Sequence, residues 1–408
     1  MLQAWMARMN SGDSSRRLEQ LWRESPPAGL RGLAWLYALG WRAYAGVYRL
    51  GLKRRAQMPI PVIGIGSLWV GGVSKTPLTV AVARYLQALG VRIAALTHGY
   101  GGSCYRTGAL LDPREYPDAS IVGDEAVELR LALPDTPLAV GKWRVPMAQA
   151  AIERWSPDAL VLDDGFQHLP LARALDLVLL PAESPLGNGY CLPAGPLREP
   201  PDGLRRADGV VLVRTSMPLA TGEAVENPHP RPLSHSAGEG SQTGCLSTEE
   251  ADVRPHPRPL SHSAGEGSQM HAWGVPEVAA YTATIAPTAL LHLSSGERLP
   301  LERLQGRPLT LLCGIARPER FRRMADALGY TVERMHIYRD HHAYTPEDLQ
   351  PLAGKTVLTT MKDAVKLRER LPSACDAYAL QIEAHLDEAL RARLQSLFTG
   401  TPHCRRES

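Results

Sequence analysis

The chain has 408 residues, which at roughly 100–200 residues per domain allows two or three domains. Hydrophobic residues make up 44% and charged residues 21%, close to ordinary globular usage, so a disordered, collagen-like or coiled-coil protein is disfavoured. The 45 Lys and Arg against 42 Asp and Glu leave a net charge of +3, so no global field draws the chain onto nucleic acid. The six cysteines lie far apart without a Cys-x-x-Cys pair, which argues against disulfides and structural zinc and favours a reducing compartment.

The N-terminal segment predicts a helix at a membrane surface rather than a signal peptide. Residues 1–20 mix charges with polar residues, so we expect the protein to stay in the cytoplasm. Gly29 to Leu50 is rich in Leu, Trp and Tyr, but its longest uncharged run, Gly32 to Trp41, is half the ~20 residues that a spanning helix needs. These aromatic residues and the basic run at 53–55 suit an amphipathic helix in the headgroup region, and equally a helix packed on its own domain. We treat residues 1–55 as a helical, membrane-associated segment.

Beyond this segment, the pattern alternates between strands and helices. An apolar strand at 60–65 precedes a glycine-rich turn, a helix at 77–89 and a strand at 91–96, which indicates a parallel sheet covered on both faces. Further strands are predicted at 159–162, 175–180, 209–213, 309–313, 331–336, 356–359 and 377–382, with helices at 318–328 and 345–352. The alternation predicts two α/β units, residues 56–215 and 271–400.

Between these units lies a compositionally biased insertion, residues 220–270. One segment occurs twice in it, letter for letter, at 228–242 and 255–269. It is rich in Pro, Gly and Ser and poor in large apolar residues, so it cannot form a packed core and predicts a disordered linker. Its histidines suggest metal binding, but no carboxylate or thiolate partners stand at a useful spacing, and the metal interpretation is disfavoured.

A glycine-rich turn between the first strand and its helix carries the strongest local signal. Its sequence is Gly71-Gly72-Val73-Ser74-Lys75-Thr76. In a phosphate-binding loop, backbone N–H groups at a helix start cradle the phosphates, a Lys reaches the β and γ oxygens, and a Thr hydroxyl holds Mg²⁺. The usual template would place glycines at the positions of Trp69 and Ser74. A tight structural turn therefore remains the alternative interpretation of this turn alone.

A second signal supports the phosphate-binding interpretation. The apolar strand that begins at Leu160 ends in Asp163 and Asp164. One Asp at such a strand tip can hold Mg²⁺, directly or through water, opposite the loop Thr76. Strand ends can also be purely structural, but in combination with the loop this pair favours an enzyme that uses ATP and Mg²⁺.

Two further sites contain candidate proton-transfer groups. Asp124 and Glu125 begin a predicted helix at 125–133, where helix capping is the ordinary role of a carboxylate. Phosphoryl transfer to a hydroxyl also needs a carboxylate that accepts the alcohol proton, and Asp124 is a candidate. A loop Asp–His pair, Asp340 and His341, is structural more often than catalytic, and it matters only if the two units face each other.

Together these motifs resemble the tetraacyldisaccharide 4'-kinase family, the lipid A 4'-kinases. The resemblance covers about Leu18 to Leu397, apart from the insertion. The stretches that carry it are Pro61–Pro77, Gly99–Gly102, Val122–Glu125, Asp163–His168, Gly187–Gly189, Leu192–Glu199, Gly314–Phe321, Asp340–His342 and Lys362–Lys366.

The resemblance implies two α/β/α lobes of P-loop NTPase type with an N-terminal amphipathic helix at the cytoplasmic face of the inner membrane. It implies transfer of the ATP γ-phosphate to the 4'-hydroxyl of tetraacyldisaccharide 1-phosphate, a lipid disaccharide, with no nucleic acid and no obligate protein partner. Lys75 would stabilise the γ-phosphate and Thr76 would bind Mg²⁺ together with Asp163 or Asp164. Asp124 would be the base, assisted by His341 or, as second choice, His342. The implied substrate-binding residues are Gln167, His168, Asn188, Arg198 and Glu199.

The chain also departs from the family pattern, with Ser67, Ser74, His98 and Met361 in place of Asn, Gly, Arg and Glu. At Ser74, a Cβ beside Lys75 is expected to crowd the phosphate or to require an unfavourable backbone angle, and so to slow catalysis. His98 lacks the permanent charge of Arg, which weakens pairing with phosphate. Two alternatives follow: an impaired homologue that binds nucleotide or lipid without turnover, and a P-loop NTPase switch for a protein partner.

Overall fold

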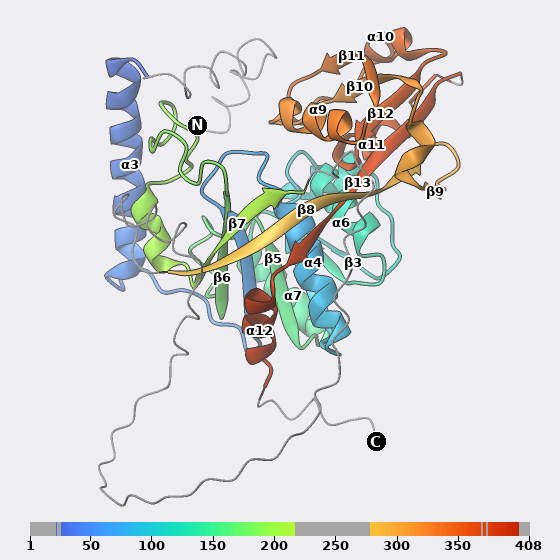
Figure 1. Cartoon of the computed structure of the whole chain (residues 1–408). Coiled ribbons are helices and arrows are strands. Elements are labelled where there is room, and N and C mark those ends of the chain that lie inside the picture. The colour runs from blue at the N-terminus through green and yellow to red at the C-terminus, as the bar shows by residue number, and fades with distance from the viewer. Residues whose placement is uncertain (1–21, 23–25, 217–277, 369, 373, 400–408) are drawn as a thin grey trace, which may run out of the picture.

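The computed structural model describes residue 22 and residues 26–216, 278–368, 370–372 and 374–399. The predicted insertion, residues 220–270, lies outside the described residues. Within them, 13 strands form one continuous mixed sheet, in the order β11-β10-β12-β13-β8-β7-β6-β1-β5-β2-β4-β3, with β9 paired to β8 (Figure 1).

The strands are β1 (Val62–Ser67), β2 (Ile93–Thr97), β3 (Ala109–Leu111), β4 (Leu138–Val140), β5 (Ala159–Asp163), β6 (Leu175–Pro181), β7 (Gly209–Thr215), β8 (Ala279–His292), β9 (Arg298–Leu299), β10 (Pro308–Cys313), β11 (Thr331–Ile337), β12 (Thr356–Thr360) and β13 (Asp376–Leu386). The α-helices are α3 (Ala28–Arg49), α4 (Lys75–Ala88), α5 (Ala119–Val122), α6 (Asp124–Ala132), α7 (Arg144–Trp155), α9 (Pro318–Ala327), α10 (Pro346–Leu349), α11 (Met361–Leu367) and α12 (Glu388–Ser396). Short 3-10 helices are η1 (Ser103–Tyr105), η2 (Pro201–Arg206), η3 (Leu301–Leu304) and η4 (Gln350–Leu352).

The first lobe, built on β1 to β7, is a parallel sheet covered by helices on both faces. The strands β7, β6, β1, β5, β2 and β4 run parallel, and only β3 is antiparallel to its neighbour β4. Along β5, Leu160 and Leu162 pack with α7, whereas Val161 belongs to the large core beneath α4 and α6. Because both faces are buried, the strands read as continuous apolar runs, as the sequence predicted.

The second lobe, built on β10 to β13, repeats this layering. Its four strands pair in parallel, and alternate residues of β10 face opposite cores. Leu311 packs with Phe321 of α9 on one face, and Leu312 packs with Leu349 of α10 and with α11 on the other. The two α/β/α lobes expected from the sequence are therefore present.

The two lobes share two long strands. The first half of β8 pairs in parallel with β7 of the first lobe, and its second half pairs antiparallel with β13 of the second lobe. After β13 the chain returns to the first lobe, where Leu390 and Leu394 of α12 join the large core. The sheet is thus continuous, and β8 and β13 run from one lobe into the other (Figure 1).

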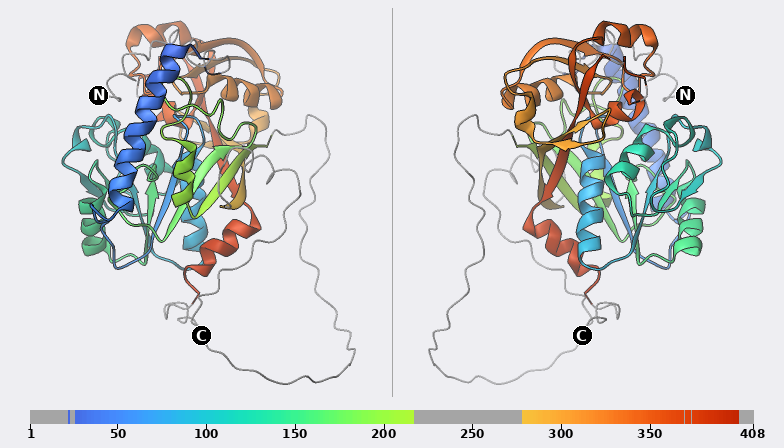
Figure 2. Two further views of the ribbon diagram at one scale, coloured as in Figure 1. Left: turned by 90° about the vertical axis from the view of Figure 1, so that its left-hand side faces the viewer. Right: turned by 90° about the vertical axis from the view of Figure 1, so that its right-hand side faces the viewer.

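The N-terminal helix α3 lies along the outside of the molecule (Figure 2). It buries only small residues, Ala34 and Ala38, while large apolar side chains face outward, led by Trp35 at 61% and Leu36 at 58% exposed. Tyr37 Oη donates a hydrogen bond of 2.6 Å to the carbonyl oxygen of Arg198, which attaches the helix to the first lobe. Among the described residues, no helix is long and apolar enough to span a membrane.

Candidate active site

One large cavity, about 1410 Å³, lies between the two lobes. The glycine-rich turn and the start of α6 line it from the first lobe, and the loop after β11 and the helix α11 line it from the second. Tyr37 and Trp41 of α3 line the same cavity, so the outward-facing helix also borders the site.

The glycine-rich turn joins β1 to α4 and has three residues in the left-handed region. Gly71 and Gly72 have φ of +67° and +64°, and Ser74 has φ of 59° and ψ of 41°. Glycine adopts such angles freely, whereas a serine pays roughly 1–2 kcal/mol. The unfavourable angle expected at Ser74 is therefore present. Lys75 and Thr76, which begin α4, line the cavity, and backbone N–H groups at a helix start commonly bind phosphates.

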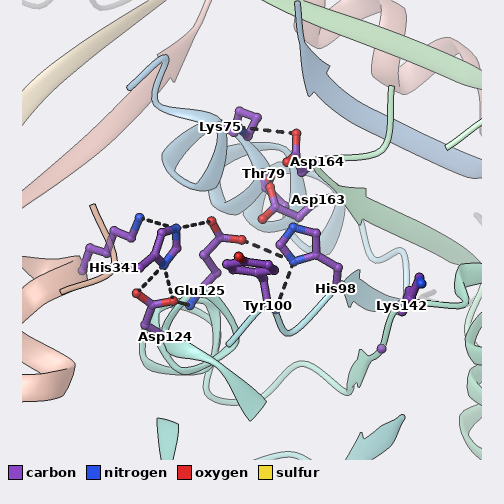
Figure 3. Close-up of polar contacts among 12 residues, drawn as sticks. Lys75, Thr79, His98, Tyr100, Asp124, Glu125, Lys142, Asp163, Asp164 and His341 are labelled. Carbon is purple, nitrogen blue, oxygen red and sulfur yellow. Dashed lines mark hydrogen bonds and ion pairs between the residues drawn. The ribbon is translucent and has the colours of Figure 1, made fainter. Parts of the chain in front are cut away.

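The two carboxylates at the tip of β5 have different surroundings. Asp164 accepts two hydrogen bonds from Arg198 Nη1, at 2.8 and 3.0 Å, and lies 3.4 Å from Lys75 Nζ (Figure 3). Burial alone would raise the pKa of Asp164, but the positive charges of Arg198 and Lys75 hold it far below its usual range.

Asp163 points instead into the core of the first lobe. Its Oδ1 accepts a hydrogen bond of 2.7 Å from Thr79 Oγ1, and burial raises its pKa to about 7. The structure thus brings Lys75 and Asp164 together, with Thr76 lining the same cavity, while Asp163 lies one layer deeper. Thr and Asp oxygens are donors suited to Mg²⁺, which keeps several waters and needs only one or two carboxylates. This donor set fits the predicted magnesium.

The two lobes meet at Asp124 and His341, which are 217 residues apart in the sequence. His341 Nδ1 lies 2.9 Å from Asp124 Oδ2 and 3.1 Å from Oδ1 (Figure 3). Burial opposes ionisation of Asp124, but the hydrogen bond from His341 lowers its pKa to about 2, so the carboxylate is charged at neutral pH. Asp124 is therefore paired across the cavity and is more than a helix cap.

His342, the second choice for this role, has different partners. Its Nε2 lies 2.8 Å from Asp348 Oδ2, and its ring stacks on Tyr338 with centroids 4.6 Å apart. The partners of His342 are thus Asp348 and Tyr338 rather than Asp124, so the geometry favours His341 as the partner of the proposed base.

The five predicted substrate-binding residues divide into two groups. Gln167 and Arg198 line the cavity. The other three, Asn188, His168 and Glu199, do not line it. The Asn188 side chain donates a hydrogen bond to Ala194 O and accepts one from Tyr190 N, and Glu199 is buried. Glu199 accepts a hydrogen bond of 2.7 Å from Gln167 Nε2 and pairs with Arg206. Burial lowers the pKa of His168 to about 4, which leaves it neutral. These three residues do not line the cavity, and a role for them in substrate binding stays a prediction.

Several residues of the site were given no catalytic or binding role in the sequence analysis. Glu125 Oε2 lies 3.6 Å from Nδ1 of His98, whose pKa is lowered by burial, so position 98 supplies no fixed cation. Burial raises the pKa of the neighbouring Glu128 to about 8. Lys362 and Lys366 approach the Asp124–His341 pair from α11. Their i, i+4 spacing places both on one helix face, which is the signal that could have found them.

The second lobe also contacts the glycine-rich turn directly. Arg320 Nη1 donates a hydrogen bond of 3.2 Å to Gly72 O, and its Nε donates one of 2.9 Å to Thr215 Oγ1 at the end of β7. The Arg317 guanidinium stands over the Trp69 ring, 4.2 Å from its centroid. The turn is therefore held from both lobes.

The fold and this site define a P-loop kinase architecture. A profile of the family described as LpxK, Tetraacyldisaccharide-1-P 4'-kinase, matches residues 27–399. The chain belongs to this family, and the resemblance inferred from the sequence is confirmed.

Individual relatives agree with the profile. A protein from Anaeromyxobacter dehalogenans (strain 2CP-C), named tetraacyldisaccharide 4'-kinase, is 37% identical over 374 residues, covering 86% of each chain. One of the same name from Syntrophus aciditrophicus is 32% identical, covering 90% of this chain and 93% of its own length. The crystal structure of LpxK from Aquifex aeolicus in complex with ATP is similar with a TM-score of 0.65 and 25% identity, covering 90% of this chain and 98% of that one.

Proposed function

We propose that the protein transfers the γ-phosphate of ATP to the 4'-hydroxyl of tetraacyldisaccharide 1-phosphate. The observation that carries the proposal is one cavity in which a phosphate-binding turn from the first lobe faces a carboxylate–histidine pair formed across both lobes. The names of the relatives supply the substrate, and the crystal structure of a family member with ATP supports the nucleotide.

The nucleotide is bound at the start of α4. The N–H groups of the glycine-rich turn surround the phosphates, and Lys75 moves from Asp164 to the γ-phosphate, a short step for a flexible ammonium 3.4 Å from its carboxylate. Thr76 and Asp164 would hold Mg²⁺, with Asp163 in the layer behind them. A bound Mg²⁺ would supply positive charge against the charge that develops on the phosphate oxygens.

Asp124 accepts the proton of the attacking hydroxyl. It is ionised at neutral pH and lies at the cavity wall, and His341 holds it in place through the Nδ1 hydrogen bond. Phosphoryl transfer needs little more from the protein than this orientation and the electrostatic stabilisation of the transferred group. Gln167 and Arg198 line the region where the sugar enters.

The acceptor reaches this cavity from the side of α3. The exposed Trp35 and Leu36 suit insertion into a headgroup layer, while Tyr37 and Trp41 on the other side of the helix line the cavity. We infer a peripheral protein at the cytoplasmic face of the inner membrane, with the lipid disaccharide passing from that surface into the site. Nothing in the described site favours an impaired homologue or a protein-directed switch.

The test is transfer of radiolabel from γ-labelled ATP to tetraacyldisaccharide 1-phosphate in detergent micelles. Wild type is expected to form labelled product only with both Mg²⁺ and lipid present. Asp124→Asn should nearly abolish this product, whereas Asp326→Asn, an exposed carboxylate on α9, should leave it unchanged. No transfer by wild type, and none gained by Ser74→Gly, would remove the kinase proposal.

A further inference from the structure

Lys362, on the first turn of α11, makes a contact that the proposed reaction has not yet used. Its Nζ donates a hydrogen bond of 2.7 Å to Asp340 Oδ1 and lies 3.1 Å from Nε2 of His341. Its side chain is 18% exposed, so the ammonium is held mostly within the site. His341 is therefore contacted on both ring nitrogens, by Asp124 at Nδ1 and by Lys362 at Nε2.

This arrangement selects one form of the imidazole. An ammonium has three N–H donors and no acceptor, so Nε2 must offer its lone pair to Lys362. The single proton of neutral His341 then stands on Nδ1, where it is donated to Asp124. Protonation of His341 would place an N–H group against the ammonium, so Lys362 also opposes the imidazolium form.

The protonation form of His341 affects how readily Asp124 accepts a proton. A carboxylate beside a neutral N–H donor is oriented and remains basic, whereas a carboxylate beside an imidazolium cation is a weaker proton acceptor. We propose that Lys362 is a positioning residue that holds His341 in the Nδ1–H tautomer and limits its protonation, so that Asp124 can take the proton of the acceptor hydroxyl. This inference rests on the proposed function.

The charges around His341 come from three elements. From α6, Asp124 is in contact and Glu125 Oε1 lies 4.0 Å from Nε2. The loop residue Asp340 lies 3.9 Å from Nε2, and the Tyr100 ring stands edge-on at 5.7 Å. On α11, besides Lys362, Lys366 lies 3.8 Å from Asp124 Oδ2.

The neighbouring carboxylates favour the imidazolium, and the charge of Lys362 opposes them. Burial lowers the pKa of His341, the hydrogen bond with Asp124 and the other carboxylates raise it above its ordinary value, and Lys362 limits that rise. Removal of this one opposing contact should therefore raise the pKa further. The pH dependence of the reaction should respond to Lys362 although this residue takes no proton itself.

The test compares the full-length Lys362→Met and Lys362→Arg variants in the label-transfer assay between pH 5.5 and 9, with separate determination of kcat and KM. The acidic limb of kcat is expected to move up by about one pH unit in Lys362→Met, a loss of about tenfold on that limb that disappears at alkaline pH. Lys362→Arg retains donors for Nε2 and Asp340 and should restore the wild-type profile. Lys355→Met, which removes an exposed lysine of the same lobe, should not change it.

Two results of this assay would overturn the inference. A loss of kcat that is equal at every pH would show a merely structural role, and a rise in KM with an unchanged kcat profile would make Lys362 a substrate contact.

A second measurement separates this inference from the proposed function. In ¹⁵N-histidine-labelled protein at a pH above the pKa of His341, the signal of this residue, assigned by its absence in His341→Gln, should show a protonated Nδ1 and an unprotonated Nε2. Its titration should move to higher pH in Lys362→Met. This experiment needs no turnover, so it decides the tautomer even if neither wild type nor Ser74→Gly transfers label and the kinase proposal falls. A proton on Nε2 of the neutral His341 imidazole in wild type would refute the role of Lys362.

Discussion

Replacement of Ser74 by glycine should make the protein both more stable and more active. Ser74 has φ of 59° and ψ of 41°, which costs a non-glycine residue roughly 1–2 kcal/mol. Ser74 stands at the N-cap of α4, but its side chain makes no capping hydrogen bond, so its replacement by glycine removes no hydrogen bond. Glycine also lowers the free energy of unfolding by roughly 0.5–1 kcal/mol, because it increases the conformational entropy of the unfolded chain. The net expectation is a gain of about 0–1.5 kcal/mol in the free energy of unfolding.

The same substitution should favour catalysis, because it removes a Cβ next to Lys75 where the phosphates approach the turn. An improvement of about 1.4 kcal/mol in transition-state binding corresponds to tenfold, which we take as the upper bound for the rise in kcat/KM for ATP. Stability is measured by urea unfolding and activity by label transfer.

The matched control is Gly71→Ser in the same turn. Gly71 also has positive φ, +67°, and a Cβ there would overlap the Cβ of Ala316 from the second lobe. This variant should therefore lose stability and activity, the opposite of Ser74→Gly. If Ser74→Gly proved less stable and less active than wild type, the serine hydroxyl would be contributing and the strain argument would be refuted.

Two further predictions concern the proposed base and the N-terminal helix. Asp124→Asn should lower kcat by about 10²–10⁴-fold with little change in KM, as measured by label transfer. The pKa of Asp124 is lowered to about 2 in the folded protein, whereas it is near 4 in the unfolded chain. The ionised carboxylate therefore stabilises the fold at pH values above about 4, and this stabilisation is lost as the pH falls toward 2. In urea unfolding, wild type should be more stable than Asp124→Asn above that range and should lose the advantage below it. The double variant Trp35→Glu, Leu36→Glu should reduce co-sedimentation with anionic phospholipid vesicles severalfold, because it places charge on the exposed apolar face of α3. Ile121→Glu, which places a charge at an exposed apolar residue of α5, should leave vesicle binding unchanged. Equal binding by wild type, the double variant and Ile121→Glu would rule out α3 as the membrane contact.

Most longer core strands of both lobes could be predicted from the sequence because they are buried and read as apolar runs, whereas the three-residue strands β3 and β4 were not predicted. The predicted ends of these longer strands lie within two residues of the observed ones, except at β13, which continues to Leu386. β8 was missed because Pro287 interrupts it and because only alternate residues of it are fully buried. The joining of the lobes into one sheet through β8 and β13 was therefore not predicted.

The candidate site could be predicted in part. Lys75, Thr76 and the two aspartates follow short-range rules, since a turn and a strand tip at one sheet edge must lie close together. No local rule brings Asp124 to His341 from another lobe, and only the family resemblance paired them. Local pattern also could not show which members of the Gln167–Glu199 region face the cavity, because that depends on how the loop after β6 folds back on itself.

The central claim is that one cavity binds the triphosphate of ATP on the first lobe and presents its terminal phosphate to a carboxylate–histidine pair formed across the lobes. It is tested most directly by a crystal structure of the protein with Mg²⁺ and a non-hydrolysable ATP analogue. We predict the terminal phosphate within hydrogen-bond distance of Lys75 Nζ, with Asp124 facing the side from which a hydroxyl would attack. A terminal phosphate bound away from Lys75, or pointing out of the cavity and away from Asp124, would contradict the account.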